Sequence, residues 1–211
     1  MKFRLLLGLI FVVLLKSSYA QSTPQVVVSI KPIHSIVESL MDGIASPELL
    51  LKSNNSAHTF HLKPSQIRMI EDADLVVSIG DQFEIGLRKA LKNLNSKNRV
   101  EIMSLNNLVL HQYRADKIYE KDHQEHDQET STYDMHLWLD ISNMKKIAHH
   151  IYLLLVDVDP VNTSRYNQNL QLLTSKLDAL ETEIEAQMHP FSSKIYATFS
   201  DTIQYFEKNI D

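Results

Sequence analysis

An alternation of strand-like and helix-like segments begins at residue 25 and constrains the fold more than any other feature of the sequence. Val26 to Ile30 is a short β-branched run, as expected for a strand that is buried on both faces. Pro32 then opens a helical pattern in which apolar residues recur three and four positions apart, and Gly43 ends it. Further strands are predicted at 48–51, 75–79 and 99–103, and further helices from Pro64 through Ile70 and from Phe83 to Leu91. This alternation predicts an α/β fold in which helices flank a parallel sheet.

One long helical pattern dominates the later part of the chain. It runs from Asn162 to Met188, with large apolar side chains spaced three or four residues apart. At 1.5 Å per residue this helix would be about 40 Å long, which is enough to cross a whole domain. The other predicted elements are a helix that Ser142 caps and Pro160 stops, a strand from Lys194 to Phe199, and a helix over Asp201 to Lys208.

Residues 1–20 have the pattern of a secretory signal peptide. Lys2 and Arg4 precede an almost unbroken apolar run from Leu5 to Leu15, and small residues complete the pattern. We expect cleavage before Gln21, and no later stretch is long enough for a membrane span. The mature protein is therefore expected to be exported, with no membrane insertion after the signal is cleaved.

The mature chain is acidic. Three of the 21 Lys and Arg residues lie within the signal peptide, whereas all 26 Asp and Glu residues follow it, which leaves a net charge of −8. This charge argues against nucleic acid and anionic membrane surfaces as partners and is compatible with cations. The chain has no cysteine, so neither a disulfide framework nor a lipid-anchored cysteine is available.

His136 is the first candidate metal ligand, in the run Tyr133 to Asp140. Leu137 and Leu139 have the period-2 spacing of a short strand, and Trp138, the only tryptophan, offers a large surface to anchor it. This pattern would hold the histidine rigidly near the end of an ordered element. The alternative interpretation is a core or turn histidine whose ring is satisfied by a backbone hydrogen bond.

A second pair of histidines, His58 and His61, lies in the loop that follows the predicted strand at 48–51. Ligands of parallel sheets bind at the carboxyl ends of the strands, so this loop is placed where a ligand is expected. The presence of similarly placed histidines favours the ligand interpretation of His136. His34, by contrast, is interpreted as structural, because its neighbours supply no metal-binding partner.

Residues 114–134 form a charged stretch that interrupts the pattern and is predicted to be a mobile loop. It carries His123 and His126 among several carboxylates. Two interpretations stay open: a solvated linker, or a segment that collects metal ions loosely.

These features resemble the periplasmic zinc-binding subunit of bacterial ABC metal transporters. The resemblance rests on the signal peptide, the Val-Ser-Ile-Lys-Pro start, Ala-His-Thr-Phe-His-Leu-Lys-Pro-Ser, the acidic His-containing insert, Met-His-Leu-Trp-Leu and the long helix, and it covers the chain from about residue 25 onward. In that family one rigid helix joins two lobes, and three histidines and usually a carboxylate hold a metal ion between the lobes. The resemblance implies a zinc receptor in which His58 and His136 are the first two ligands.

The resemblance also implies how the chain is divided. The implied parts are the signal peptide at 1–20, an N-terminal metal-binding lobe at 21–160, a long linking helix at 161–189 and the start of a truncated second lobe at 190–211. The family's Phe-His-Asp strand end aligns with Phe199-Ser200-Asp201, so Ser200 stands where the third histidine is expected. Zinc binding is therefore expected to be impaired by Ser200 and by the missing second lobe. His61 is a candidate for a third nitrogen, although the family does not use that position.

The implied ligand is a zinc ion that is transported, and the implied partner of the monomeric receptor is the membrane permease of an ABC transporter. Imidazole nitrogens favour zinc and its neighbours, whereas manganese would want more oxygen ligands. The same residues allow two alternative functions. A one-lobed periplasmic metal chaperone or buffer would use the same histidines together with the charged loop. A zinc hydrolase is disfavoured, and an enzyme is not expected, because the sequence lacks His-Glu-x-x-His, a nucleophile elbow and a glycine-rich phosphate loop.

Overall fold

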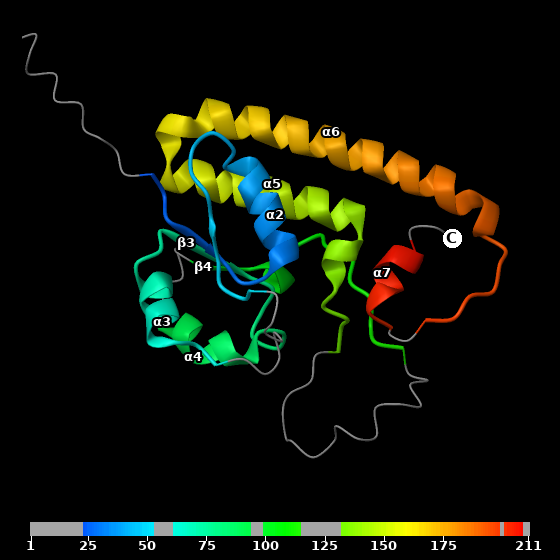
Figure 1. Ribbon diagram of the computed structural model, residues 1–211, viewed down its shortest axis with the longest axis horizontal. Helices are drawn as coiled ribbons and strands as arrows, with labels where there is room; N and C mark the ends of the chain where they lie inside the picture. The colour runs from blue at the N-terminus through cyan, green and yellow to red at the C-terminus, as the bar shows by residue number, and fades with distance from the viewer. Residues whose placement is uncertain (1–22, 53–60, 94–98, 115–131, 199–200, 209–211) are drawn as a thin grey trace, which may run out of the picture.

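A four-stranded parallel sheet lies at the centre of the computed structural model, which describes residues 23–52, 61–93, 99–114, 132–198 and 201–208 (Figure 1). The strands are β1 (Val26–Val28), β2 (Glu48–Leu49), β3 (Leu75–Ser78) and β4 (Arg99–Glu101), in the order β2-β1-β3-β4. Val27 lies opposite Glu48 on one side and Val76 on the other. The predicted α/β fold with a parallel sheet is confirmed, and all four strands leave their carboxyl ends at one edge.

Helices cover the sheet on both sides, as predicted. Figure 1 shows the helices labelled α2, α5 and α6 on one side of the sheet and the helices labelled α3 and α4 on the other. The helices are α2 (Lys31–Leu40), α3 (Pro64–Glu71), α4 (Arg88–Lys92), α5 (Ile141–Val158), α6 (Thr163–Met188) and α7 (Gln204–Glu207). Short 3-10 turns are found at Ile85–Leu87, Ile102–Ser104, Leu137–Leu139, Pro160–Asn162, His189–Phe191 and Asp201–Ile203. No helix in these described ranges is both long and apolar enough to cross a membrane.

The apolar faces of the helices meet the sheet in one core. Ile33, Ile36 and Leu40 of α2 fall at helical spacing and are each no more than 1% exposed, as are Val76 and Val77 of β3. The three α2 side chains have the spacing that the sequence pattern predicted for one face of a helix. Burial of this kind supplies most of the stability of a chain without disulfides.

The long helix α6 is anchored to the body through its N-terminal half. The Tyr166 hydroxyl donates to Asp159 Oδ2 at 2.9 Å, and Asn169 Nδ2 donates to the Leu40 carbonyl at 2.7 Å. After Leu177 no side chain of the helix is fully buried. Figure 1 shows this second half extending past the end of α5. The predicted helix from residue 162 to 188 is confirmed to within one residue.

The predicted strand at Leu137 and Leu139 is wrong. These residues form a 3-10 turn that leads into α5, and the helix is capped by Asp140 rather than by Ser142. Asp140 Oδ1 accepts from the Asn143 backbone N–H at 2.7 Å, and Asn143 Nδ2 donates to the Leu137 carbonyl at 3.2 Å. These side-chain hydrogen bonds favour a turn where the alternation of leucines alone was compatible with a strand.

The predicted strand from Lys194 to Phe199 is also wrong in the part that the structure describes. Residues 194–198 have no regular structure and are exposed, and Phe199 lies outside the described residues. A strand needs a neighbour to accept and donate its backbone hydrogen bonds, and none of the described strands pairs with this stretch. The helix predicted over Asp201 to Lys208 is present as a 3-10 turn followed by α7.

Candidate metal centre

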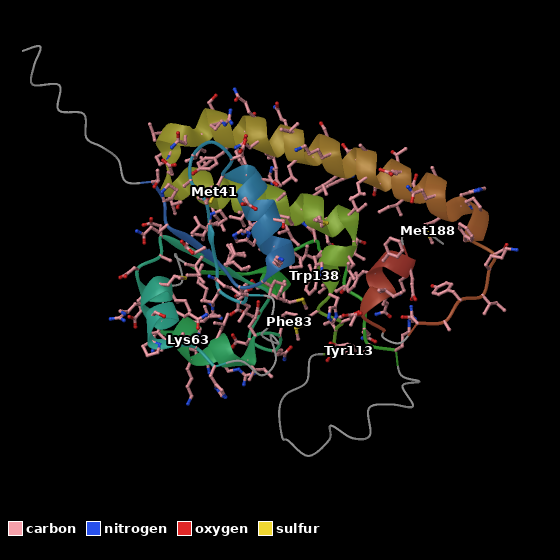
Figure 2. The ribbon with its side chains drawn as sticks, viewed as in Figure 1. Met41, Lys63, Phe83, Tyr113, Trp138 and Met188 are labelled. Carbon is pink, nitrogen blue, oxygen red and sulfur yellow. The ribbon has the colours of Figure 1, made fainter. Side chains whose placement is uncertain are left out.

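His136 lies at the carboxyl edge of the sheet, against two aromatic side chains. Its ring centroid is 5.9 Å from that of Phe83, which follows β3, and 5.2 Å from that of Trp138, and both ring pairs meet edge to face. Figure 2 shows Phe83 and Trp138 close together beneath α2 and α5. The Phe83 and Trp138 rings pack against the imidazole, yet the His136 side chain is 22% exposed and still reaches solvent. The sequence correctly predicted Trp138 as the anchoring surface.

A buried carboxylate fixes the orientation of the His136 ring. Asp134 is 1% exposed, and its Oδ1 lies 2.9 Å from the His136 backbone nitrogen and 2.7 Å from its Nδ1. A carboxylate accepts hydrogen bonds, so in the neutral form of the ring Nδ1 carries the proton and Nε2 has the lone pair. Carboxylate–histidine pairs of this kind orient metal-ligating imidazoles and raise their basicity. The ring is therefore bonded to a carboxylate and not to a backbone carbonyl, which favours the ligand interpretation.

A second buried carboxylate, Glu84, braces the turn after β3. Its Oε1 accepts from the Ile79 N–H at 2.9 Å and from the Ser29 hydroxyl, and its Oε2 accepts from the Gly80 N–H at 2.9 Å. Glu84 is fully buried, and burial raises the pKa of its carboxyl although these hydrogen bonds oppose the shift. With its oxygens turned toward the backbone, Glu84 serves to fix the neighbouring Phe83, on which His136 packs.

The other predicted ligands are placed only in part. His61 is exposed, just ahead of α3, whereas His58, His123, His126 and Ser200 lie outside the described residues. Both ends of the segment that carries His58 are tied by Gln66. Its Oε1 accepts from the Lys63 N–H at 2.9 Å, and its Nε2 donates to the Leu50 carbonyl at 2.9 Å. Within the described ranges no three His, Asp or Glu side chains gather as a metal site would require.

A hollow of about 270 Å³ opens beside the turn that follows β3. It is lined by Gly80, Asp81, Glu101 and Met135, among others. Both of its carboxylates already have a cation as partner. Asp81 Oδ1 accepts from Arg99 Nη2 at 3.1 Å, and Glu101 forms an ion pair with the same guanidinium. A metal ion would have to displace Arg99, so this hollow is a poor metal site.

His34 is structural, as predicted. Its Nε2 lies 2.9 Å from the Pro47 carbonyl oxygen, which ties α2 to the segment entering β2.

Two carboxylates of the site were not predicted from the sequence: Asp134, which bonds His136, and Glu84, which braces the turn after β3. An acidic residue two positions before a candidate histidine was a usable signal for Asp134, whereas nothing local marks Glu84.

Comparison with known proteins gives consistent results. Residues 26–211 match the ZnuA family, described as the periplasmic component A of the zinc-uptake complex. The high-affinity zinc uptake system protein ZnuA of Brucella abortus (strain 2308) is 32% identical over 220 residues, covering 90% of this chain and 66% of that protein. The chain thus spans about two thirds of the length of the curated relatives that it matches.

Solved structures show the same fold. A crystal structure of ZnuA superposes with a TM-score of 0.72 at 25% identity, covering 90% of this chain and 68% of the other. The periplasmic zinc-binding protein TroA from Treponema pallidum has a TM-score of 0.71 at 18% identity, covering 90% of this chain and 64% of that one. At so low an identity the second comparison establishes the fold alone.

Proposed function

Because this chain belongs to the ZnuA family of periplasmic zinc-uptake components, we propose that it is an extracytoplasmic receptor that captures a zinc ion and delivers it to the permease of an ABC transporter. The observation that carries this proposal is the pairing of His136 Nδ1 with the buried Asp134 carboxylate at 2.7 Å. This pairing leaves Nε2 as a fixed nitrogen donor at the sheet edge where parallel α/β folds bind ligands. A receptor binds and releases its ion without chemical change, so no catalytic residue is assigned.

We assign His136 and His58 as the principal zinc ligands. His58 belongs to the segment that leaves β2 at the same sheet edge, and Gln66 ties both ends of that segment. His61 is the candidate for a further nitrogen, and Ser200 stands where the family pattern has a histidine. His123 and His126 would contribute only weak sites.

Zinc is the ion of choice because the proposed donors are imidazoles. Neutral imidazole suits zinc, whereas manganese and magnesium prefer carboxylate and carbonyl oxygens. Two buried carboxylates of this region already have partners: Asp134 Oδ1 bonds the imidazole itself, and Glu84 bonds backbone N–H groups. In this proposal the chain acts as a periplasmic monomer with its metal lobe at 21–160 and its linking helix at 161–189.

The proposal is tested by zinc titration calorimetry on the chain from Gln21 onward. His136→Ala should weaken the tightest zinc site at least about a hundredfold, because few nitrogen ligands hold the ion. His34→Ala is the matched control, since His34 also packs at a strand–helix junction but bonds the Pro47 carbonyl. Equal zinc affinity in His136→Ala and the parent would overturn the assignment of His136, and an equal loss in both variants would show that folding, not ligation, was disturbed.

A further inference from the structure

The short helix α7 docks onto the segment that carries His136. Tyr205 is fully buried, and its hydroxyl donates to the Asp134 carbonyl at 2.7 Å and accepts from the His111 N–H at 3.1 Å. Its ring lies 4.7 Å from the His111 ring. Burial raises the pKa of Tyr205 to about 12, so the hydroxyl keeps its proton and remains a donor across the physiological range.

Two further contacts hold α7 in the same place. Gln204 Nε2 donates to the Gln112 carbonyl at 3.0 Å, and the buried Glu207 forms an ion pair with Arg114. Figure 2 shows α7 directly above the labelled Tyr113, which lies between the two contacted residues. The docking is therefore specific, with an aromatic hydroxyl, an amide and a carboxylate each meeting a partner about ninety positions earlier in the chain.

Asp134 links this docking to His136. The Asp134 backbone N–H donates to the His111 carbonyl at 2.8 Å, and the Asp134 carbonyl accepts from Tyr205. The Tyr205 hydroxyl therefore bonds to both His111 and Asp134, which also bond to each other. Asp134 Oδ1 holds His136, whereas its Oδ2 is buried without a hydrogen-bond partner among the described residues. The position of the carboxylate consequently depends on its backbone, which Tyr205 fixes.

We propose that Tyr205 is a positioning residue for zinc binding, which acts by holding Asp134 and, through Asp134, the imidazole of His136. The proposal rests on the proposed function, since it takes His136 as a zinc ligand. Tyr205 itself does not contact the ion. The element that follows the long helix thereby sets the geometry of a ligand in the N-terminal lobe.

Tyr205→Phe is the direct test, and Tyr166→Phe is its matched control. Both tyrosines are fully buried, and both hydroxyls donate to an oxygen of an aspartate: Tyr166 to the Asp159 carboxylate at 2.9 Å, and Tyr205 to the Asp134 backbone carbonyl at 2.7 Å. We expect both variants to lower the Tm of the metal-free protein by similar amounts. Only Tyr205→Phe should also weaken zinc binding, by about three- to tenfold, because only Tyr205 holds the partner of a ligand.

A spectroscopic signature separates positioning from general loosening. Nitrogen-15 imidazole NMR should show the His136 Nδ1 proton as hydrogen-bonded in the parent and in Tyr166→Phe, with faster exchange in Tyr205→Phe. In an Asp134→Ala background, Tyr205→Phe should cause no further loss of zinc affinity, because the intermediary is already gone.

A measurement on the unsubstituted protein completes the test and needs no variant. Coupling is reciprocal, so zinc should slow hydrogen exchange of the His111 amide, which donates to Tyr205. The Asp159 amide, which donates to the Leu155 carbonyl, serves as the reference and should be less affected. Equal protection of both amides would overturn the proposal.

The possible failures are distinguishable. If His136→Ala loses zinc but Tyr205→Phe binds zinc as tightly as Tyr166→Phe, the positioning role falls and the receptor assignment stands. If His136→Ala binds zinc like the parent, both proposals fall together.

Discussion

Two buried carboxylates lie next to His136 or to the Phe83 ring that supports it, and they are used in opposite ways. Glu84 has both oxygens engaged, by the Ser29 hydroxyl and by two backbone N–H groups. Asp134 Oδ1 accepts from the backbone N–H and from the ring Nδ1 of His136, and its Oδ2 has no hydrogen-bond partner in the described part of the chain. Glu84 holds mainly backbone N–H groups of its own turn, whereas Asp134 holds the imidazole and the backbone N–H of a single residue, His136.

The two carboxylates differ in how far along the chain their hydrogen-bond partners lie. Two of the three donors to Glu84 come from residues four and five positions away, so its turn is closed locally. Asp134 is held by Tyr205, which lies 71 positions away. Local contacts survive movements of distant elements, whereas long-range contacts transmit them. In the proposed site the turn carrying Phe83 is therefore the rigid wall, and we expect the turn carrying Asp134 to be the part that responds to zinc.

The largest effect is expected from Glu84→Ala. This change leaves three buried donors without an acceptor, at ~1–3 kcal/mol each, and is partly offset because a buried carboxyl is removed. The free energy of unfolding of the metal-free protein should fall by about 2–5 kcal/mol, measured by urea denaturation. A loss below ~1 kcal/mol would show that other contacts close this turn.

Asp134→Ala should give the reverse pattern, with a smaller effect on folding and a larger one on zinc. Removal of a carboxylate that orients a ligating histidine lowers metal affinity by about 10- to 100-fold. The unfolding free energy should fall by only about 1 kcal/mol, because the exposed edge of His136 lets water replace the lost acceptor. The proposed difference between the two carboxylates would be wrong if Asp134→Ala bound zinc as tightly as the parent and were destabilised as much as Glu84→Ala.

The smallest effect is on the pH dependence of stability, where the two regions should differ in sign. Burial raises the Glu84 pKa above 4.5, so its contribution to stability is present below pH 4.5 and is lost as pH rises through the folded-state pKa. Burial, and then Lys208 at 3.2 Å, lowers the His111 pKa below 6.5, so the contribution of His111 is present above pH 6.5 and is lost on acidification.

Thermal unfolding of the metal-free protein between pH 4 and 8 would measure both slopes. Glu84→Gln should reduce the decrease in Tm that occurs as the pH is raised. His111→Gln should reduce the decrease in Tm that occurs as the pH is lowered. Either variant flattening the other's slope would contradict the assignment.

Much of the fold could be predicted because its patterns admit one answer. The β-branched run at Val26–Val28 is too short for a helix and too apolar for a loop, and the period of α6 persists over 26 residues. The turn at Leu137–Leu139 could not be predicted in this way. Three residues of alternating character fit a strand or a turn, and side-chain hydrogen bonds from Asp140 and Asn143 decided between them.

The candidate site was predictable only where it is local. His136 and Trp138 stand in one apolar run, so their packing followed from the sequence. The contacts of Glu84 with Ser29 and of Tyr205 with Asp134 join residues 55 and 71 positions apart. Such contacts depend on how the elements meet in three dimensions, and no periodicity of a single segment carries that information.

The exposed stretch at 192–198 acts as a tether for α7. A four-residue helix is far too short to be stable as a separate peptide in water. Covalent attachment to α6 through this short tether keeps Tyr205 at an effective concentration on the order of millimolar near its acceptor. Docking is then a unimolecular step, and even weak individual contacts keep the helix seated most of the time. Lengthening or cutting the tether would dilute Tyr205 without altering any contact at the site, so occupancy of the Asp134 carbonyl is governed by chain connectivity as much as by chemistry.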